Sequence, residues 1–247
     1  MDRIEKADEL FDQLYDKHTQ VHDQDYHEMM KNHIYGSVYQ HGSLDLKLRE
    51  LILIVVQTTN HTLKPLKEHV FAGIKAGLKA EEILEAVYQC TPYVGYGKVC
   101  EALDAVNEVF EEKHIVVSDE ERATVTEKTR FEDGLAIQVA TFGERIRENY
   151  ENAPRELKHI QNYLSEHCFG DFYTRKGLNM KTRELLTFVM IATLGGCENQ
   201  LRGHTAGNLA VGNDRETLIE TITQCQPYIG FPRTLNAINI INEVTNK

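Results

Sequence analysis

The sequence contains no tryptophan and has only five prolines and five cysteines among its 247 residues. The cysteines are odd in number and include no Cys-x-x-Cys pair, which fits a reducing compartment better than a disulfide framework. No stretch reaches the roughly 18 uninterrupted apolar residues of a membrane span, and the first residues lack the apolar centre of a signal peptide. We therefore expect a cytoplasmic protein that does not enter the membrane.

Positive charge is also scarce, because the chain has 27 Lys and Arg residues but 38 Asp and Glu residues, which gives a net charge of −11. Nucleic acids and anionic membranes require a basic face, so an acidic chain is not expected to bind either. Hydrophobic residues make up 41% and charged residues 26% of the chain, as in an ordinary globular protein. The composition predicts a folded protein.

The chain contains an internal repeat. Residues 47–51 (KLREL) recur as residues 181–185 (KTREL), and residues 89–96 (QCTPYVGY) recur as residues 224–231 (QCQPYIGF). The first pair is offset by 134 residues and the second by 135. The two copies therefore differ by a single-residue gap, which we expect near residues 58–61.

The repeat predicts two tandem all-α units, residues 1–115 and 116–247. Apolar residues recur with helical spacing, few runs alternate as a strand would, and glycine or proline ends each run. Helices are expected at residues 46–57, 66–76, 80–89 and 98–110 of the first unit and at residues 181–194, 197–209, 217–224 and 232–244 of the second. Between them we expect a short polar connector over residues 111–119, followed by a helical region over residues 120–150 that is interrupted at its two glycines.

Residues that can carry chemistry gather in the second unit. Glu184 lies in the KTREL segment, and Cys197 and His204 follow a Gly-Gly pair. Together with the Tyr-Ile-Gly-Phe-Pro segment at residues 228–232, this pattern resembles the carboxymuconolactone decarboxylase family, which includes the alkylhydroperoxidase D type. The first unit resembles a degenerate copy. The resemblance implies an all-helical, cofactor-free fold in which Glu184, Cys197 and His204 are catalytic.

Cys197 has a context that favours reactivity, since a thiolate at the start of a helix is stabilised by unpaired N–H groups and the helix dipole. His204 lies about 10 Å further along an ideal helix, so a direct Cys–His hydrogen bond is not expected. Gln200 occupies the position where the peroxidase branch of the family has a second cysteine. Without that thiol, peroxide reduction would need an external thiol, and the decarboxylase branch is favoured.

The resemblance to the decarboxylase branch implies loss of CO2 from 4-carboxymuconolactone to give an enol-lactone. This reaction requires cations for the carboxylates and a proton donor for the dienolate that remains. Arg183, Arg202 and Arg233, together with Gln200, are the candidate substrate-binding residues, because guanidinium binds carboxylate bidentately. His204 is the candidate acid and base, and Glu184 either orients it or moves a proton itself.

Three functions stay open: a decarboxylase or related lactone enzyme, a thiol-dependent peroxide reductase that uses Cys197, and a noncatalytic interaction or sensing module. A structural ion pair is an alternative role for Glu184, because it follows Arg183 just as Glu50 follows Arg49. Single-repeat relatives form rings, commonly of six units. The resemblance therefore implies a homotrimer of two-repeat chains, acting on a small anionic substrate.

The first unit keeps Glu50 and His69 but has Thr62 at the cysteine position, which predicts a scaffold without a site of its own. Cys90 and Cys225 occupy equivalent positions ahead of proline and are expected in the core. Histidines are frequent before residue 42, at positions 18, 22, 27, 33 and 41. Their irregular spacing does not match a metal site, and we expect no metal.

Overall fold

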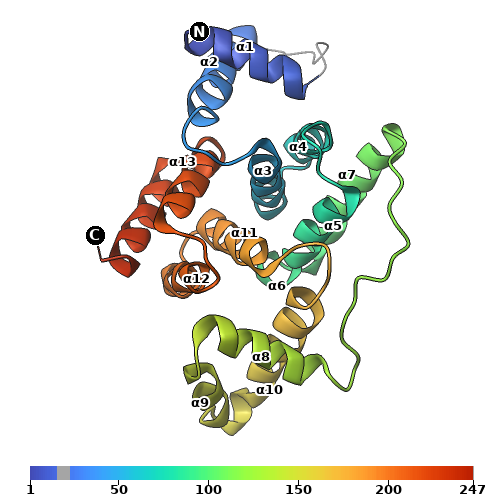
Figure 1. Ribbon diagram of the computed structural model, residues 1–247, viewed down its shortest axis with the longest axis vertical. Helices are drawn as coiled ribbons and strands as arrows, with labels where there is room; N and C mark the ends of the chain where they lie inside the picture. Colours follow the sequence, from blue (N-terminus) through green and yellow to red (C-terminus); the bar gives the residue numbers. More distant parts are fainter. Residues whose placement is uncertain (16–22, 247) are drawn as a thin grey trace.

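The computed structural model describes residues 1–15 and 23–246, and these residues form helices and loops without a strand (Figure 1), which confirms the all-α prediction. The first unit contains α1 (Arg3–Leu14), α2 (Gln24–His33), the π-helical turn η1 (Ile34–Val38), α3 (Leu46–Asn60), α4 (Leu63–Lys75), α5 (Ala80–Gln89), α6 (Thr91–Val94) and α7 (Tyr96–Glu112). The second contains α8 (Arg130–Phe142), α9 (Arg145–Glu151), the 3-10 turn η2 (Arg155–Leu157), α10 (Lys158–Tyr163), the π-helix η3 (Leu164–Tyr173), α11 (Met180–Leu194), α12 (Glu198–Ala210) and α13 (Arg215–Val244).

The core lies around α3 and α11, which pack against each other at the centre of the molecule (Figure 1). Residues 51–56 of α3 and 185–192 of α11 are buried on every face of their helices. A helix that is apolar all round is stable only when other helices enclose it. Helices α4 to α7 cover one side of this central pair, and α12 and α13 cover the other.

The two units share one plan. In the first, α1 packs against η1, and in the second α8 packs against η3, so a helix pair ending in a π-helix precedes each central helix. The one-residue gap of the repeat falls in the turn after the central helix. That turn uses His61, with a left-handed φ of 60°, in the first unit, and Gly195 and Gly196, with φ of 68° and 69°, in the second.

The segment between α7 and α8 differs from the sequence prediction. The helix expected from residue 120 begins only at Arg130, and residues 115–126 are extended without helix, so the connector is long rather than short (Figure 1). Contacts to other elements hold this segment. The Ser118 N–H donates to Glu81 at 2.7 Å, and Arg122 pairs with Glu85 of α5 at 3.0 Å. These tertiary contacts replace the local hydrogen bonds of a helix.

The break near the end of the chain is set by glycine and not by proline. We expected a helix over residues 217–224 to end ahead of Pro227, but α13 continues through this proline to Gly230, which has a φ of 76° and kinks the helix. Gly95, the equivalent residue of the first unit, has a φ of 91° and separates α6 from α7. Only glycine adopts such angles readily, so both units break at the same place.

Gly134 lies inside α8 instead of interrupting it, and it allows α8 to approach η3 closely. A Cβ atom there would lie 1.9 Å from the Ser165 carbonyl oxygen and 2.6 Å from the Gly170 nitrogen. Backbone atoms cannot move aside cheaply, so Gly134→Ala is expected to lower the free energy of unfolding by about 1–3 kcal/mol in urea denaturation. Gly97→Ala is the matched control, because nothing lies within 4 Å of its Cβ position in α7. Equal losses in both variants would contradict this account of Gly134.

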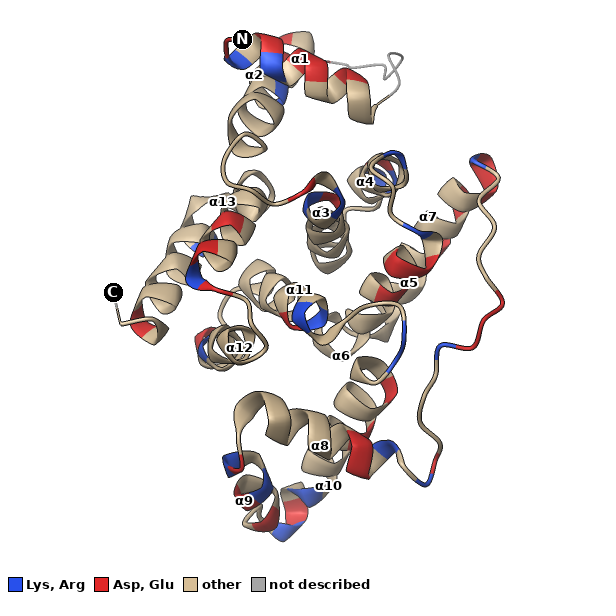
Figure 2. Ribbon diagram, viewed as in Figure 1, with Lys and Arg blue, Asp and Glu red and all other residues tan. Residues whose placement is uncertain are grey.

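Charged residues do not gather on one element of the described chain. Figure 2 shows Lys and Arg scattered among Asp and Glu over many helices. Among the described residues, no helix combines the length and the apolar character that crossing a membrane requires.

Candidate active site

A buried carboxylate and an imidazole form the centre of the candidate site. Glu184 lies on α11 with its side chain 0% exposed, and its Oε1 lies 2.5 Å from Nδ1 of His204 on α12. Its other oxygen accepts a hydrogen bond from the Tyr173 hydroxyl at 3.2 Å. Gly207 of α12 leaves room for the carboxylate, because a Cβ there would lie 2.6 Å from Glu184 Oε1. The small residue therefore lets the two helices meet closely enough to bury Glu184.

The carboxylate determines which nitrogen of His204 is available for chemistry. An imidazole that bonds a carboxylate through Nδ1 carries its proton there and presents Nε2 to a substrate. Among the described residues, none hydrogen-bonds Nε2. Burial, followed by the charge of Glu184, raises the pKa of Tyr173 well above its usual value, so its hydroxyl stays a donor to the carboxylate. The Glu184–His204 dyad is therefore arranged for proton transfer at Nε2.

The first unit contains the same arrangement, although the sequence predicted only a scaffold there. Glu50 of α3 is 0% exposed, and its Oε2 lies 2.9 Å from Nδ1 of His69 on α4. The Tyr39 hydroxyl donates to the other oxygen of Glu50 at 2.5 Å. Two Glu–His dyads thus occupy equivalent places in the two units.

Each dyad also receives an aromatic side chain from the opposite unit. Tyr228 of the second unit meets His69 edge-on, with ring centres 5.3 Å apart. Tyr93 of the first unit meets His204 in the same way at 6.2 Å. These tyrosines lie in the repeated Gln-Cys-x-Pro-Tyr segment, which sequence analysis identified as a repeat but did not connect with the site. The recurrence of the segment was the signal that could have found them.

Cys197 is not brought together with the dyad. It caps the N-terminus of α12 and is partly buried, and among the described residues no hydrogen bond joins it to Glu184 or His204. It lines a separate hollow of about 20 Å3 that also includes Arg233. The structure therefore joins Glu184 and His204 by a hydrogen bond, whereas the catalytic role of Cys197 stays a prediction.

Arg183 does not lie where a substrate clamp would. Its side chain is 1% exposed, and it donates to Gln89 Oε1 at 2.7 Å and to Glu85 Oε2 at 3.1 Å in the other unit. Arg49 makes the corresponding contact to Gln224 at 2.8 Å. Both arginines link the units, so the predicted role of Arg183 in substrate binding does not fit this geometry. Burial lowers the pKa of Arg183, and the bonds to Glu85 oppose that effect.

The other predicted substrate-binding residues lie on the surface. Gln200, Arg202 and Arg233 are exposed. Arg202 pairs with Glu243 at 2.8 Å, also on the surface. Their substrate-binding role stays a prediction.

Among the described residues, no group of three or more His, Cys, Asp or Glu side chains is placed to hold a metal ion. His18 and His22, which belong to the histidine-rich start of the chain, lie outside the described residues.

The five cysteine thiols are expected to divide into two classes by their reactivity in the native protein. Cys90, Cys168 and Cys225 are buried, and burial raises the pKa of Cys168 to about 12 and those of the other two further. Cys100 and Cys197 are only half-buried. Because the thiolate is the reactive form, Ellman's reagent at about pH 8 should modify two thiols in the native protein and all five after unfolding. Rapid modification of more than two native thiols would contradict this assignment.

The fold and the paired dyads define an all-α protein of two tandem helical repeats, each with a buried Glu–His pair. The sequence profile of the carboxymuconolactone decarboxylase family matches the chain twice, over residues 24–108 and 158–243, and the chain belongs to this family. It is 29% identical over 121 residues to a 4-carboxymuconolactone decarboxylase of Acinetobacter baylyi, an alignment that covers 49% of this chain and 90% of that protein. It is also 38% identical over 82 residues to an uncharacterized 15.0 kDa protein of the nqo9-nqo10 intergenic region of Paracoccus denitrificans, covering 33% of this chain and 61% of that protein.

Proposed function

We propose that the chain is a carboxy-lyase that removes CO2 from a small anionic lactone such as 4-carboxymuconolactone, without a metal or organic cofactor. The observation that carries this proposal is the Glu184–His204 dyad, in which a buried carboxylate holds an imidazole at 2.5 Å. Membership of the family and the likeness to a 4-carboxymuconolactone decarboxylase support the reaction class.

The dyad suits the protonation step of such a reaction. Loss of CO2 leaves an electron pair delocalised as a dienolate, which must receive a proton at carbon. Protonated His204 delivers that proton from Nε2, and Glu184 stabilises the imidazolium that precedes the transfer. Tyr173 keeps the carboxylate oriented through its hydrogen bond to Oε2. Of the predicted arginines, Arg233 is exposed and available to attract an anionic substrate, Arg202 is exposed but paired with Glu243, and Arg183 is buried and occupied.

The experiment that tests the proposal is an assay with 4-carboxymuconolactone, monitored by CO2 release and by ultraviolet absorbance, with and without dithiothreitol. We expect turnover that does not depend on the thiol reagent. Peroxide consumption that requires Cys197 and added thiol would instead establish a peroxide reductase. That outcome is disfavoured because no hydrogen bond among the described residues joins Cys197 to the dyad, and because Gln200 stands at the position of a resolving thiol. The absence of detectable activity in both assays would support a noncatalytic interaction or sensing module.

We also propose that three chains assemble into a ring-like homotrimer and act in the cytoplasm. Tyr96 and Phe231 occupy equivalent places in the two units and are 77% and 63% exposed, so each unit offers a large aromatic side chain to a neighbour. All five cysteines are free thiols, which fits a reducing compartment. Light scattering at micromolar concentration should give three times the chain mass of 28.3 kDa. A monomer mass would rule out this assembly.

A further inference from the structure

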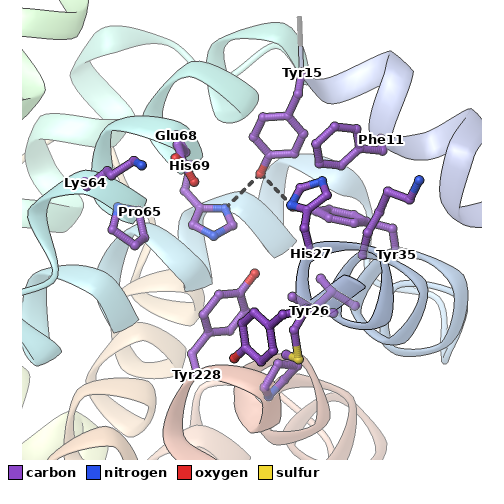
Figure 3. A pocket seen from close by; sticks show the side chains of 14 residues that line it. Phe11, Tyr15, Tyr26, His27, Tyr35, Lys64, Pro65, Glu68, His69 and Tyr228 are labelled. Atoms are coloured by element: carbon purple, nitrogen blue, oxygen red, sulfur yellow. Dashed lines mark hydrogen bonds between the residues drawn. The ribbon is translucent and has the colours of Figure 1, made fainter. Parts of the chain in front are cut away.

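A cavity of about 440 Å3 opens in the first unit beside His69 (Figure 3). This volume falls within the range of small-molecule sites, which is about 300–1,000 Å3. Its walls are largely aromatic and apolar, with Phe11, Tyr26, Met30 and Tyr228 among the lining residues. A flat, apolar ring is the kind of group that such walls accommodate.

Among the polar side chains that line the cavity, His69 and Tyr15 lie side by side and offer an acceptor next to a donor. Nδ1 of His69 bonds Glu50, so the proton of the neutral ring lies on Nδ1 and Nε2 accepts. Figure 3 shows this second ring nitrogen pointing into the space toward Tyr228. The Tyr15 hydroxyl lies 3.4 Å from Nδ1 and receives a hydrogen bond from Tyr35 at 3.0 Å. Because Nδ1 of His69 already carries a proton, it cannot accept a hydrogen bond from Tyr15. The Tyr15 hydroxyl can therefore donate its proton to a ligand.

Burial, followed by the charge of Glu50, raises the pKa of Tyr15 well above its usual value, so its hydroxyl stays protonated. Of the charged lining residues, Lys31 is already paired with Asp8 and Glu28, and Lys64 and Glu68 carry opposite charges. The lining therefore favours no strongly charged ligand. A neutral group that both donates and accepts one hydrogen bond matches this arrangement.

We propose that this cavity is a second small-molecule site, separate from the Glu184–His204 dyad, and that it takes a small planar phenol or enol. The ligand hydroxyl donates to Nε2 of His69 and accepts from the Tyr15 hydroxyl, while its ring lies among the aromatic walls.

The second unit lacks the hydroxyls that this recognition uses. Phe142 packs against His204 with ring centres 5.2 Å apart, where Tyr15 stands beside His69 in the first unit. Phe142 in turn contacts Phe169, whereas Tyr15 contacts Tyr35. The two dyads therefore have different surroundings, and recognition of a hydroxyl belongs to the first unit.

The experiment is a fluorine NMR titration of the full-length protein with 4-fluorophenol, compared with 4-fluoroanisole, which has no hydroxyl proton to donate. We expect saturable binding of the phenol and affinity about tenfold lower for the anisole, because the polar groups of the site would be left unpaired. Tyr15→Phe, which introduces the residue type of the second unit, should weaken phenol binding about threefold or more, and His69→Gln about tenfold. Met30→Trp, which fills the cavity, should abolish it.

His204→Gln is the matched control and should bind 4-fluorophenol as the wild type does. The proposal is overturned if Met30→Trp and Tyr15→Phe bind the phenol unchanged, if the anisole binds equally well, or if His204→Gln alone removes binding. Tyr15→Phe removes a single oxygen and should leave the fold intact. It therefore tests the proposal even if the His69→Gln protein does not fold. Binding is measured without turnover, so this result is independent of the decarboxylation assay.

Discussion

Replacing Arg183 by methionine is expected to lower the free energy of unfolding by about 2–3 kcal/mol, the cost of removing buried hydrogen bonds to charged and polar partners. Glu85 keeps its ion pairs with Arg122 and Arg175, so no buried charge is left alone. The guanidinium is enclosed between the two units, where it bonds the Gln89 side chain, the Glu85 carboxylate and the Arg175 carbonyl oxygen. Methionine fills much of the space but donates no hydrogen bond. Gln89 Oε1 would lose its partner in the interior, and an unpaired buried polar atom is costly.

Urea denaturation of the Arg183→Met protein measures this loss of stability. Arg202→Met, measured in the same way, is the matched control. Arg202 is exposed and pairs with exposed Glu243, so its loss should cost no more than about 1 kcal/mol. Unchanged stability of Arg183→Met, combined with a raised KM for a confirmed substrate, would restore the role of substrate clamp that the sequence predicted.

Replacing His204 by alanine should reduce the rate of decarboxylation by about 10^2–10^4-fold, the range that a general acid or base contributes. Only Nε2 of this ring is free to exchange a proton with substrate, because Glu184 holds Nδ1. Glu184→Gln should also reduce turnover, because a neutral amide stabilises the imidazolium less than a carboxylate does. His167→Ala is the matched control, since His167 is a half-exposed histidine of the same unit that pairs with Asp171.

His167→Ala should retain wild-type turnover, and both histidine variants should keep the helical circular dichroism of the parent. Unchanged turnover in His204→Ala on a confirmed substrate would remove the dyad from the proposed mechanism. A matching loss in both variants would indicate a general effect on the fold.

Most of the helical framework could be predicted from the sequence, because the repeat and the apolar spacing are local signals. The central helices, the turn that contains the gap and the burial of Cys90 and Cys225 follow from these signals. The connector could not be predicted in this way. Residues 115–126 are held by α5 and by the loop before α11, where the Thr124 hydroxyl donates to the Thr174 carbonyl and the Lys176 N–H to the Arg122 carbonyl. Such distant partners leave no periodic pattern in the segment itself.

The candidate site was predictable in part. The resemblance to the family placed Glu184 and His204 on adjacent helices, and the structure joins them. The sequence alone could not place Arg183, because an arginine is equally suited to a substrate carboxylate and to Glu85 of another helix, and only the packing of the two units brings it to Glu85. The aromatic residues from the opposite unit were missed, although their recurring Gln-Cys-x-Pro-Tyr segment could have indicated them.

The exchange of tyrosines between the units has a consequence for assembly. In a polypeptide with one repeat, the ring that covers the dyad histidine would have to come from a second molecule, so completion of the site would depend on protein concentration. Here Tyr93 and Tyr228 reach across within one chain. Covalent linkage of the two repeats turns an encounter between subunits into an internal contact, and the walls around both histidines stay complete at any dilution.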